Sequence, residues 1–359
     1  MRKNSSLWLW RVLTTGAAAV TILFAATSSS AQSAQSLKGK NLVIASWGGV
    51  WTELSKKYFG DPFSADTGVK VTFIESGNGF APQSIAQEQS GNVQWDLLDA
   101  AGSDAYLLES KGYLEHFPRS LIDAIKPLVR PDQLTTTFTL DYGDTATLIA
   151  CNPGVMKKCP TNPKEFWDVE NFPGPRAILN NAEAAMMFAL QADGIPPAKV
   201  FPMDIPRAIK KLQQIKPNVR VWPASGAQQQ QVMIDGEVGA SLMWNGRAWT
   251  VKKQNVPNLQ MNWDGAVVGA GGLAVLKNAP NKDVAFAFIK WFAEHHEKQA
   301  GWTSEITYPT PTNKLLELVP KEVAAALPAA HKPLKEDTAW IVAHKEETQK
   351  AWQQFLTGQ

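Results

Sequence analysis

The sequence is poor in the residues on which metal sites and hydrolytic active sites depend. Its 359 residues include two cysteines and five histidines. Two cysteines without further ligands nearby do not make a zinc site. The adjacent pair His295-His296 lacks the i, i+4 spacing of a zinc-hydrolase helix, and no Gly-x-Ser-x-Gly motif occurs. The sequence therefore does not support an enzyme, and we expect no catalytic residue, no metal and no cofactor.

Positive charge is also scarce once the N-terminus is set aside. The whole chain has a formal net charge of +2, and removing Arg2, Lys3 and Arg11 leaves the remainder at −1. Beyond that point Lys and Arg form no block longer than a pair, such as Lys56-Lys57 or Lys210-Lys211. Binding to a nucleic acid needs several basic side chains gathered against phosphates. We therefore expect no nucleic-acid partner.

The N-terminus reads as a secretory signal. Arg2, Lys3 and Arg11 precede or flank an apolar run over residues 12–26, and small residues follow at Ser29-Ser30-Ala31. The run is too short for a comfortable membrane span, and no cysteine follows that a lipid would modify. We expect a signal peptide over residues 1–31, cleaved near Ala31, and a mature protein in the periplasm.

The mature chain is long enough for two lobes, and its two cysteines fit an oxidising compartment. About 328 residues remain after cleavage, more than one hydrophobic core usually supports. Cys151 and Cys159 lie eight residues apart around Asn152-Pro153-Gly154. In the periplasm this spacing predicts a local disulfide that closes a loop.

Short apolar segments alternate with helical patterns along the chain. Residues 42–46, 69–74 and 95–98 have strand character, and helical spacing follows each of them. A second series of this kind begins at residues 177–179, and a glycine-rich strand is expected over residues 267–276. This alternation predicts an α/β protein with a mostly parallel, doubly wound sheet.

Aromatic residues follow several of these strands, next to glycine, asparagine or proline. Trp47 precedes Gly48-Gly49, Tyr142 precedes Gly143, Trp244 precedes Asn245-Gly246, and Tyr308 precedes Pro309. The carboxyl ends of strands in an α/β sheet meet at the crevice where ligands bind. Four aromatic side chains at such positions favour a binding cleft that holds an alkyl chain or a cationic group.

Four segments in this order resemble bacterial periplasmic solute-binding proteins. They are Ala45-Ser46-Trp47-Gly48-Gly49, Tyr142-Gly143-Asp144-Thr145-Ala146, Gly236-Glu237-Val238 with Trp244-Asn245-Gly246, and Tyr308-Pro309-Thr310-Pro311. The likeness runs from about residue 40 to the C-terminus and is greatest to the spermidine/putrescine-binding branch. It implies a type II-like fold of two α/β lobes, each a mixed, mostly parallel sheet flanked by helices, which close over a ligand by hinge motion.

The resemblance also implies how the lobes divide the chain. The N-terminal lobe is expected over residues 32–143 and 268–310, and the C-terminal lobe over residues 144–267 and 311–359. Two crossover strands are expected near residues 142–146 and 264–268.

The binding-site residues carried over by the resemblance do not match the polyamine binders throughout. Trp47, Tyr142 and Trp244 match positions where the family packs aromatics on its ligand, and Asn181 and Glu183 match a polar or acidic position. The acid that polyamine binders carry past the second crossover is replaced by glycines around Gly271. Their aromatic pair after the third strand is replaced by Gly102, Ser103 and Asp104. The expected ligand-binding set is Trp47, Gly48, Ser103, Asp104, Tyr142, Asp144, Asn181, Glu183, Trp244, Asn245, Arg247 and Tyr308.

Arg247 decides between two kinds of ligand. If its guanidinium faces the cleft, it is suited to bind a carboxylate through two hydrogen bonds, and an amino-acid-like ligand is favoured over a bare polyamine. If Arg247 points outward, it pairs with a surface acid and carries no such information.

The sequence thus predicts a monomeric periplasmic receptor that captures a small nitrogenous solute, polyamine-like or amino-acid-like, and delivers it to an inner-membrane ABC permease. One alternative is a receptor of the same fold for ferric iron or an oxyanion. Related folds bind iron through neighbouring tyrosines, and the five tyrosines here include no adjacent pair. A second alternative is an exported hydrolase, which would have to turn over an ester, glycoside or phosphate.

Overall fold

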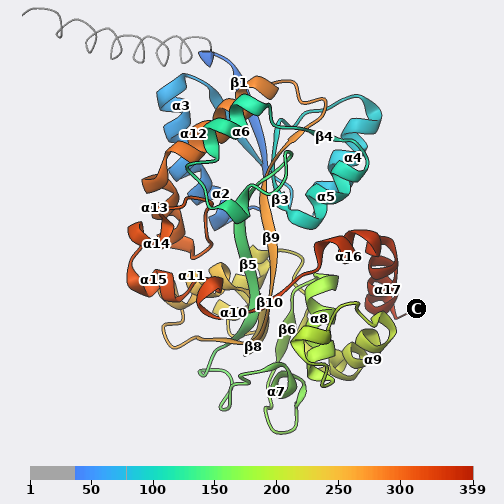
Figure 1. Cartoon of the computed structure of the whole chain (residues 1–359). Helices are drawn as coiled ribbons and strands as arrows, with labels where there is room; N and C mark the ends of the chain where they lie inside the picture. The colour runs from blue at the N-terminus through green and yellow to red at the C-terminus, as the bar shows by residue number, and fades with distance from the viewer. Residues whose placement is uncertain (1–36, 78, 359) are drawn as a thin grey trace, which may run out of the picture.

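The computed structural model describes residues 37–77 and 79–358, so the expected signal peptide at residues 1–31 lies outside the described residues. Two lobes are joined by long strands that run between them (Figure 1). All strands belong to one sheet in the order β2-β1-β3-β9-β5-β8-β6-β7, with β4 and β10 paired to β9 as well. The mixed α/β architecture with two lobes confirms the predicted fold class.

The first lobe, called the N-lobe, is built on parallel strands that are buried between helices. Strand β1 (Asn41–Ser46) pairs in parallel with β2 (Lys70–Glu75) on one side and β3 (Leu97–Ala101) on the other. Its apolar run is buried almost throughout, as expected for a central parallel strand. The helices of this lobe are α2 (Val50–Ser55), α3 (Asp61–Thr67), α4 (Phe80–Ser90), α5 (Gly102–Ser110), α6 (Arg119–Ile125) and α12 (Lys282–Glu294).

The second lobe, called the C-lobe, repeats the pattern with shorter strands. Strand β6 (Arg176–Ile178) pairs in parallel with β7 (Val219–Val221) and β8 (Ala240–Trp244). The helices are α7 (Pro163–Trp167), α8 (Ala182–Ala192), α9 (Ile205–Ile215), α10 (Gly226–Ile234) and α11 (Asn245–Gln254). Helix α8 is apolar apart from Glu183 and Gln191 and is buried along its whole length, which places it inside this lobe.

Two long antiparallel strands pass from one lobe to the other. They are β5 (Leu140–Cys151) and β9 (Gln260–Leu276), and they pair Gly143 with Gly271 and Ala146 with Val268. The segment around Tyr142 is continuous strand with a register shift after Asp141. The predicted crossover segments therefore lie side by side, although the exact lobe boundaries stay a prediction.

The hydrophobic core is divided in the same way. One buried cluster contains residues between Leu42 and Tyr142 together with residues between Leu273 and Tyr308. Two further clusters lie in the C-lobe, and the larger of these includes Trp352 and Phe355 from the C-terminal helix. A small fourth cluster joins Trp249 to α13 (His296–Ile306), α14 (Leu315–Leu318) and α15 (Lys321–Ala325).

The C-terminal segment bridges the two lobes. After β10 (Leu334–Lys335) come α16 (Thr338–Ala343) and α17 (Lys345–Thr357). Helix α17 packs on α8 and α9 of the C-lobe, whereas α16 packs on α5 of the N-lobe. Figure 1 shows this pair beside the boundary between the lobes. The segment therefore brings its side chains to the interlobe region.

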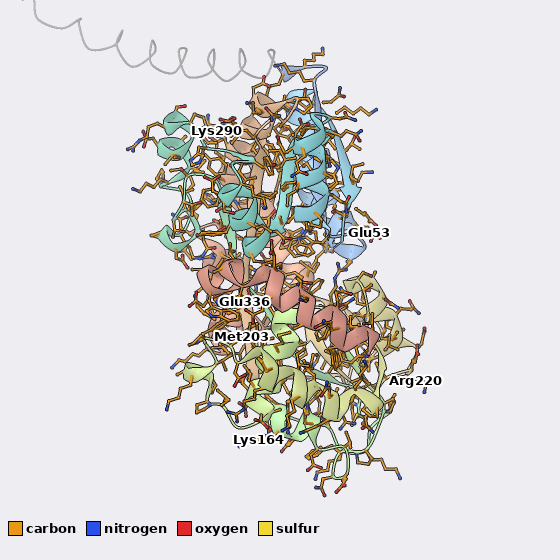
Figure 2. The ribbon with its side chains drawn as sticks, turned by 90° about the vertical axis from the view of Figure 1, so that its right-hand side faces the viewer. Glu53, Lys164, Met203, Arg220, Lys290 and Glu336 are labelled. Carbon is orange, nitrogen blue, oxygen red and sulfur yellow. A yellow bond between two sulfur atoms is a disulfide. The ribbon has the colours of Figure 1, made fainter. Side chains whose placement is uncertain are left out.

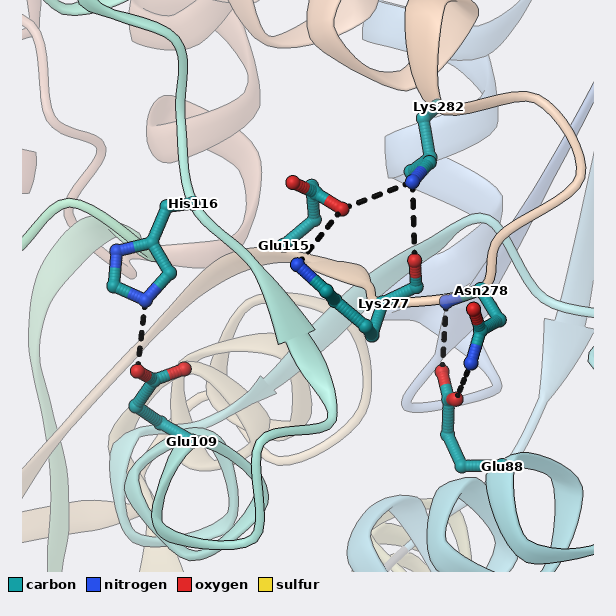
Figure 3. Close-up of polar contacts among 7 residues, drawn as sticks. All are labelled: Glu88, Glu109, Glu115, His116, Lys277, Asn278 and Lys282. Carbon is teal, nitrogen blue, oxygen red and sulfur yellow. Dashed lines mark hydrogen bonds and ion pairs between the residues drawn. The ribbon is translucent and has the colours of Figure 1, made fainter.

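Polar contacts hold the far end of the N-lobe together. Glu115 in β4 (Leu114–Glu115) pairs with Lys282 at 2.9 Å and Lys277 at 3.4 Å (Figure 3). Glu88 in α4 accepts hydrogen bonds from the backbone and side-chain nitrogens of Asn278. These contacts fix the turn between β9 and α12, and so help to set where β9 enters the lobe.

The predicted disulfide is present. Cys151 and Cys159 are bonded, with their Cα atoms 5.7 Å apart, and the bond closes the loop that follows β5. None of the helices in the described part of the chain has the length and apolarity that a membrane span requires.

Candidate functional site

A cavity of about 450 Å³ lies between the two lobes. Nine of the twelve residues expected from the sequence line it: Trp47, Ser103, Asp104, Tyr142, Asn181, Glu183, Trp244, Arg247 and Tyr308. They come from strand ends and helix starts of both lobes, and Gly269, Ala270 and Gly271 of β9 complete the wall. Their convergence is the arrangement that the strand-end argument expects, while their part in ligand binding stays a prediction.

One end of the cavity is aromatic and is shared between the lobes. Trp47, which follows β1, makes an edge contact with Trp244 at the end of β8, with ring centroids 5.7 Å apart. Trp51 in α2 packs against Tyr142 at 6.1 Å and Tyr308 at 4.9 Å. Trp51 was missing from the sequence prediction because its helical spacing marked it only as a core residue.

Arg247 is buried at this aromatic end without a charged partner. It lies in the first turn of α11, and 1% of its surface is exposed. One guanidinium nitrogen donates to the backbone oxygen of Gly48 at 3.0 Å and another to Gln230 at 3.1 Å. Among the described residues its Nε has no hydrogen-bond partner, and burial lowers its pKa.

Arg176 shows what a purely structural buried arginine looks like in the same protein. Its guanidinium donates to the backbone oxygens of Phe166, Phe172 and Gly174 at distances between 2.5 and 2.9 Å. It does not line the cavity. Each guanidinium nitrogen of Arg176 has a carbonyl acceptor. Nε of Arg247 has none and is enclosed beside Gly226, and Arg247, unlike Arg176, lines the cavity.

Asp99 is the most important wall residue that the sequence did not single out. It lies in β3, is 4% exposed and accepts a hydrogen bond from Nε1 of Trp51 at 2.5 Å. Burial raises its pKa to about 7, against the opposing effect of hydrogen bonds from Trp51, Trp47, Tyr142 and Ser46. The available signal was one acid in the apolar run Leu97-Leu98-Asp99-Ala100, where an unpaired charge is costly.

The opposite end of the cavity is lined by three acids and a lysine. Lys345, at the start of α17, pairs with Glu183 of α8 at 3.0 Å. Burial raises the pKa of Asp104 to about 6 and that of Glu336 to about 7. Burial alone would lower the pKa of Lys345. The nearby carboxylates, of which Glu183 has the largest effect, outweigh burial, and the pKa of Lys345 is raised.

Two of these four residues come from the C-terminal segment. Glu336 lies at the level between the lobes (Figure 2), and Lys345 follows on α17. Strand-end reasoning did not find them, because Glu336 follows only the two-residue strand β10 and Lys345 lies on a helix of the C-terminal segment. Only the structure shows that these two side chains line the cavity.

Asn181 has a structural task as well as a place in the cavity wall. Its side-chain oxygen accepts a hydrogen bond from the backbone N–H of Ala184 at 2.9 Å, which caps the start of α8. The neighbouring Asn180 accepts from Nε1 of Trp352 at 2.6 Å. These bonds hold α8 and α17 in place behind the acidic end.

Three expected residues lie outside the cavity wall. The side chain of Asn245 is fully buried, where it accepts from the N–H of Ala146 and donates to the oxygen of Thr307. Asp144 pairs with Lys335 at 3.2 Å instead of facing the cavity. Gly48 contributes its backbone oxygen to Arg247 and has φ of +83°, a conformation that favours glycine. These three positions support the site from behind.

The tyrosines of the cavity do not suit iron. Burial raises the pKa of Tyr142 well above its ordinary value and that of Tyr308 to about 12, so both phenols stay protonated near neutral pH. In the part of the chain that the structure describes, no group of three His, Cys, Asp or Glu side chains is placed to hold a metal ion. The geometry therefore gives no support to the ferric alternative.

Comparison with known families agrees with the geometry. The sequence profile of the bacterial extracellular solute-binding proteins matches residues 59–356. The gamma-aminobutyric acid-binding protein of Pseudomonas aeruginosa is 29% identical, covering 92% of this chain and 95% of that protein. The spermidine/putrescine-binding periplasmic protein of Escherichia coli is 25% identical, covering 76% of this chain and 79% of that protein.

Solved structures show the same architecture. The binding protein AgtB of Agrobacterium tumefaciens R10 in complex with agropinic acid superposes with a TM-score of 0.80 at 28% identity, covering 89% of this chain and 99% of that one. The binding protein AttC of A. tumefaciens C58 in an open unliganded conformation gives 0.61 at 27% identity, covering 88% and 99%. At nearly equal identity, this chain superposes better on the liganded structure than on the open one.

Proposed function

The chain belongs to the family of bacterial extracellular solute-binding proteins, and we propose that it is the periplasmic receptor of an ABC importer for a small amino-acid-like solute. The ligand carries a carboxylate that binds Arg247, and a nitrogen group that binds an acid of the same cavity. It is held between the lobes as a monomeric receptor closes, and is then passed to the membrane permease. The family and the relatives named above are binding proteins, so no turnover is expected.

The observation that carries this proposal is the state of Arg247. A buried charge without an ion pair costs several kcal/mol, because its lost hydration is not replaced. Hydrogen bonds to Gly48 and Gln230 replace part of that hydration, and Nε is left unused. A ligand carboxylate against the guanidinium supplies the ion pair that Arg247 lacks.

The same feature argues against a polyamine. Every charged group of putrescine or spermidine is cationic. A cationic group of either ligand would share the cavity with the guanidinium of Arg247 at its aromatic end, and the two positive charges would repel each other. The missing acid near Gly271, noted in the sequence, points the same way. The relative named for gamma-aminobutyric acid (GABA) covers more of the chain at higher identity than the named polyamine relative, which supports a ligand that carries both charges.

Contacts between the lobes support a closing receptor. The guanidinium of Arg247 in the C-lobe donates to Gly48 of the N-lobe, and Trp244 meets Trp47 across the same boundary. Both contacts lie at the aromatic end of the cavity. The residues proposed to bind the ligand are thus the ones that hold the lobes together, which couples binding to closure.

The test uses the mature protein, with GABA, L-glutamine, L-ornithine and putrescine compared by thermal shift and titration calorimetry. We expect at least one amino acid to stabilise the protein, and putrescine to bind more weakly. Arg247→Gln removes charge-assisted hydrogen bonds of about 1.5–3 kcal/mol, which corresponds to roughly 10- to 150-fold weaker binding.

Arg220→Gln is the matched control. Arg220 lies at the outer edge of the C-lobe, far from Glu336 (Figure 2), and pairs with Glu237 at 3.5 Å, so its loss leaves affinity unchanged. Tight binding of putrescine, with no shift by any amino acid, would sink the proposal. Equal affinity of the Arg247→Gln variant and the wild type for the bound amino acid would sink the role of Arg247.

A further inference from the structure

We infer that Asp99 is the subsite for the ammonium group of the ligand. This inference rests on the proposed function and deepens it, because it makes the ligand a zwitterion with both of its charges held at the aromatic end. It also separates Asp99 from the three acids at the other end of the cavity, which contact neither charge of the ligand.

The surroundings of Asp99 contain donors but no cation. The carboxyl group lines the cavity and is almost completely buried. Its donors are the indole of Trp51 and, in addition, Trp47, Tyr142 and Ser46, all of which are neutral. In the described part of the chain Asp99 forms no ion pair. Neutral donors orient a carboxylate but leave its charge uncompensated.

The acids at the other end differ in this respect. Glu183 has an ion pair with Lys345, and the charge of Lys345 also favours the ionised forms of Asp104 and Glu336. An ammonium group placed there would be repelled by Lys345 while it was attracted by the acids. Beside Asp99 it meets one carboxylate and aromatic rings, the combination that recognises alkylammonium groups.

Asp99 and Arg247 are connected through the same aromatic side chains. Nε1 of Trp51 donates to Asp99, and the ring of Trp51 packs on Tyr308 with centroids 4.9 Å apart. Burial raises the pKa of Tyr308, and the nearby positive charge of Arg247 is the largest effect that lowers it. One cavity end therefore presents an unpaired acid and an unpaired base, which a zwitterion neutralises together and a dication does not.

A simpler role is also open to Asp99, namely to orient Trp51, Trp47 and Tyr142 without touching the ligand. The two roles differ in what happens when the amino group is removed from the ligand. If Asp99 binds the ammonium group, a ligand without that group binds more weakly to the wild type, and the Asp99→Asn variant binds the two ligands equally. If Asp99 only orients aromatics, Asp99→Asn weakens both ligands by the same factor.

The experiment therefore measures GABA and butyrate, which lacks the amino group, by titration calorimetry on the wild type, Asp99→Asn and Asp104→Asn. Asp104→Asn is the matched control, because it makes the same acid-to-amide change at the other end of the same cavity. We expect the wild type and Asp104→Asn to prefer GABA at least tenfold, and Asp99→Asn to lose that preference. Equal weakening of both ligands in Asp99→Asn, or loss of the preference in Asp104→Asn, overturns the inference.

Proton release gives a second readout that does not need Asp99→Asn to fold. The buried acid is partly protonated in the free protein near pH 6, and an ammonium group ionises it on binding. Calorimetry in two buffers of different ionisation enthalpy should show proton release with GABA and none with butyrate, in the wild type and in Asp104→Asn alike. Release that disappears in Asp104→Asn assigns the ammonium to the other end and overturns the inference.

If GABA does not bind, the same comparison uses the tightest amino acid of the panel and its des-amino analogue. A wild type that binds putrescine but no amino acid refutes the proposed function itself. A wild type that binds an amino acid and its des-amino analogue equally well refutes only the role of Asp99.

Discussion

Replacing Gly226 with alanine separates the affinity of the site from the stability of the fold. Gly226 is the first residue of α10, and its φ is not in the left-handed region. A Cβ atom there would lie 2.6 Å from Nε of Arg247 and 3.1 Å from the ring of Trp244. The backbone therefore accepts alanine, but the wall of the cavity does not.

The expected magnitude follows from those distances. An ordinary carbon contact begins near 3.4 Å, so the guanidinium of Arg247 must move by roughly 0.8 Å from its 2.6 Å position. It cannot swing freely, because Gly48 and Gln230 hold it and almost none of its surface is exposed. A shift of this size misaligns a charge-assisted hydrogen bond to the ligand, a loss of about 1.5–3 kcal/mol, or roughly 10- to 150-fold in Kd.

Stability is expected to fall only slightly. Alanine is favoured over glycine within helices by up to about 1 kcal/mol, and this gain offsets part of the local crowding. Calorimetric titration gives the affinity for the best amino acid of the panel, and thermal unfolding without ligand gives the stability. A Gly226→Ala variant with unchanged Kd would refute the placement of Arg247 in the binding site; a variant with a much lower Tm would refute the local nature of the change.

Three further predictions concern stability. Burial raises the pKa of Asp99 and of Glu336 to about 7; between about pH 4 and 7 the folded protein therefore holds protons that the unfolded chain has released, and stability falls as pH rises. We expect a lower Tm for the ligand-free protein at pH 8 than at pH 5, and a higher Tm at pH 8 would contradict these shifts. Replacing Cys151 and Cys159 by serine removes the disulfide that closes a loop with a sequence separation of 8 residues. The gain in chain entropy of the unfolded state lowers the free energy of unfolding by about 2.5 kcal/mol, and Tm by several degrees. An unchanged denaturation midpoint would argue against that contribution. Lys345→Met leaves the buried carboxylate of Glu183 unpaired. Because 23% of the lysine side chain is exposed, the loss in free energy of unfolding is about 1–3 kcal/mol, less than for a fully buried pair. Denaturant unfolding at pH 7.5 measures this loss, and a gain in stability would count against the pairing.

Fold class was predictable because the pattern that defines it is local. The run of residues 42–46 is short and apolar, as a parallel strand buried on both faces needs, whereas residues 69–74 alternate and form the more exposed edge strand β2. The disulfide was equally local, since only two cysteines exist and they lie eight residues apart. Element ends were less accurate: β3 begins at Leu97 and not at residue 95.

Strand-end reasoning placed some residues in the cavity wall and missed others for one reason. Strand-end reasoning locates residues such as Trp47 and Trp244, which follow strands of the parallel series. It cannot locate Glu336 or Lys345, because the C-terminal segment reaches the cavity through tertiary packing. It also counted Asn245 as a ligand contact, because a polar residue beside a strand-end aromatic gives no sign of whether its amide bonds to ligand or to backbone.

The unpaired charges of the cavity explain how closure can depend on what is bound. While the lobes are apart, Arg247 and Asp99 keep part of their hydration, and the absence of ionic partners costs little. Closure removes that water and brings Arg247 against Gly48, so the cost of two uncompensated charges falls entirely on the closed form. A zwitterion lowers the free energy of the closed form alone, by an amount that reflects both charges, and a ligand can shift an equilibrium only by such a difference. A dication leaves Arg247 uncompensated and an anion leaves Asp99 uncompensated, so each favours closure less than the zwitterion does. In the proposed receptor, selectivity is then a property of the closed state as a whole, set by two groups that form no ion pair with the described part of the chain.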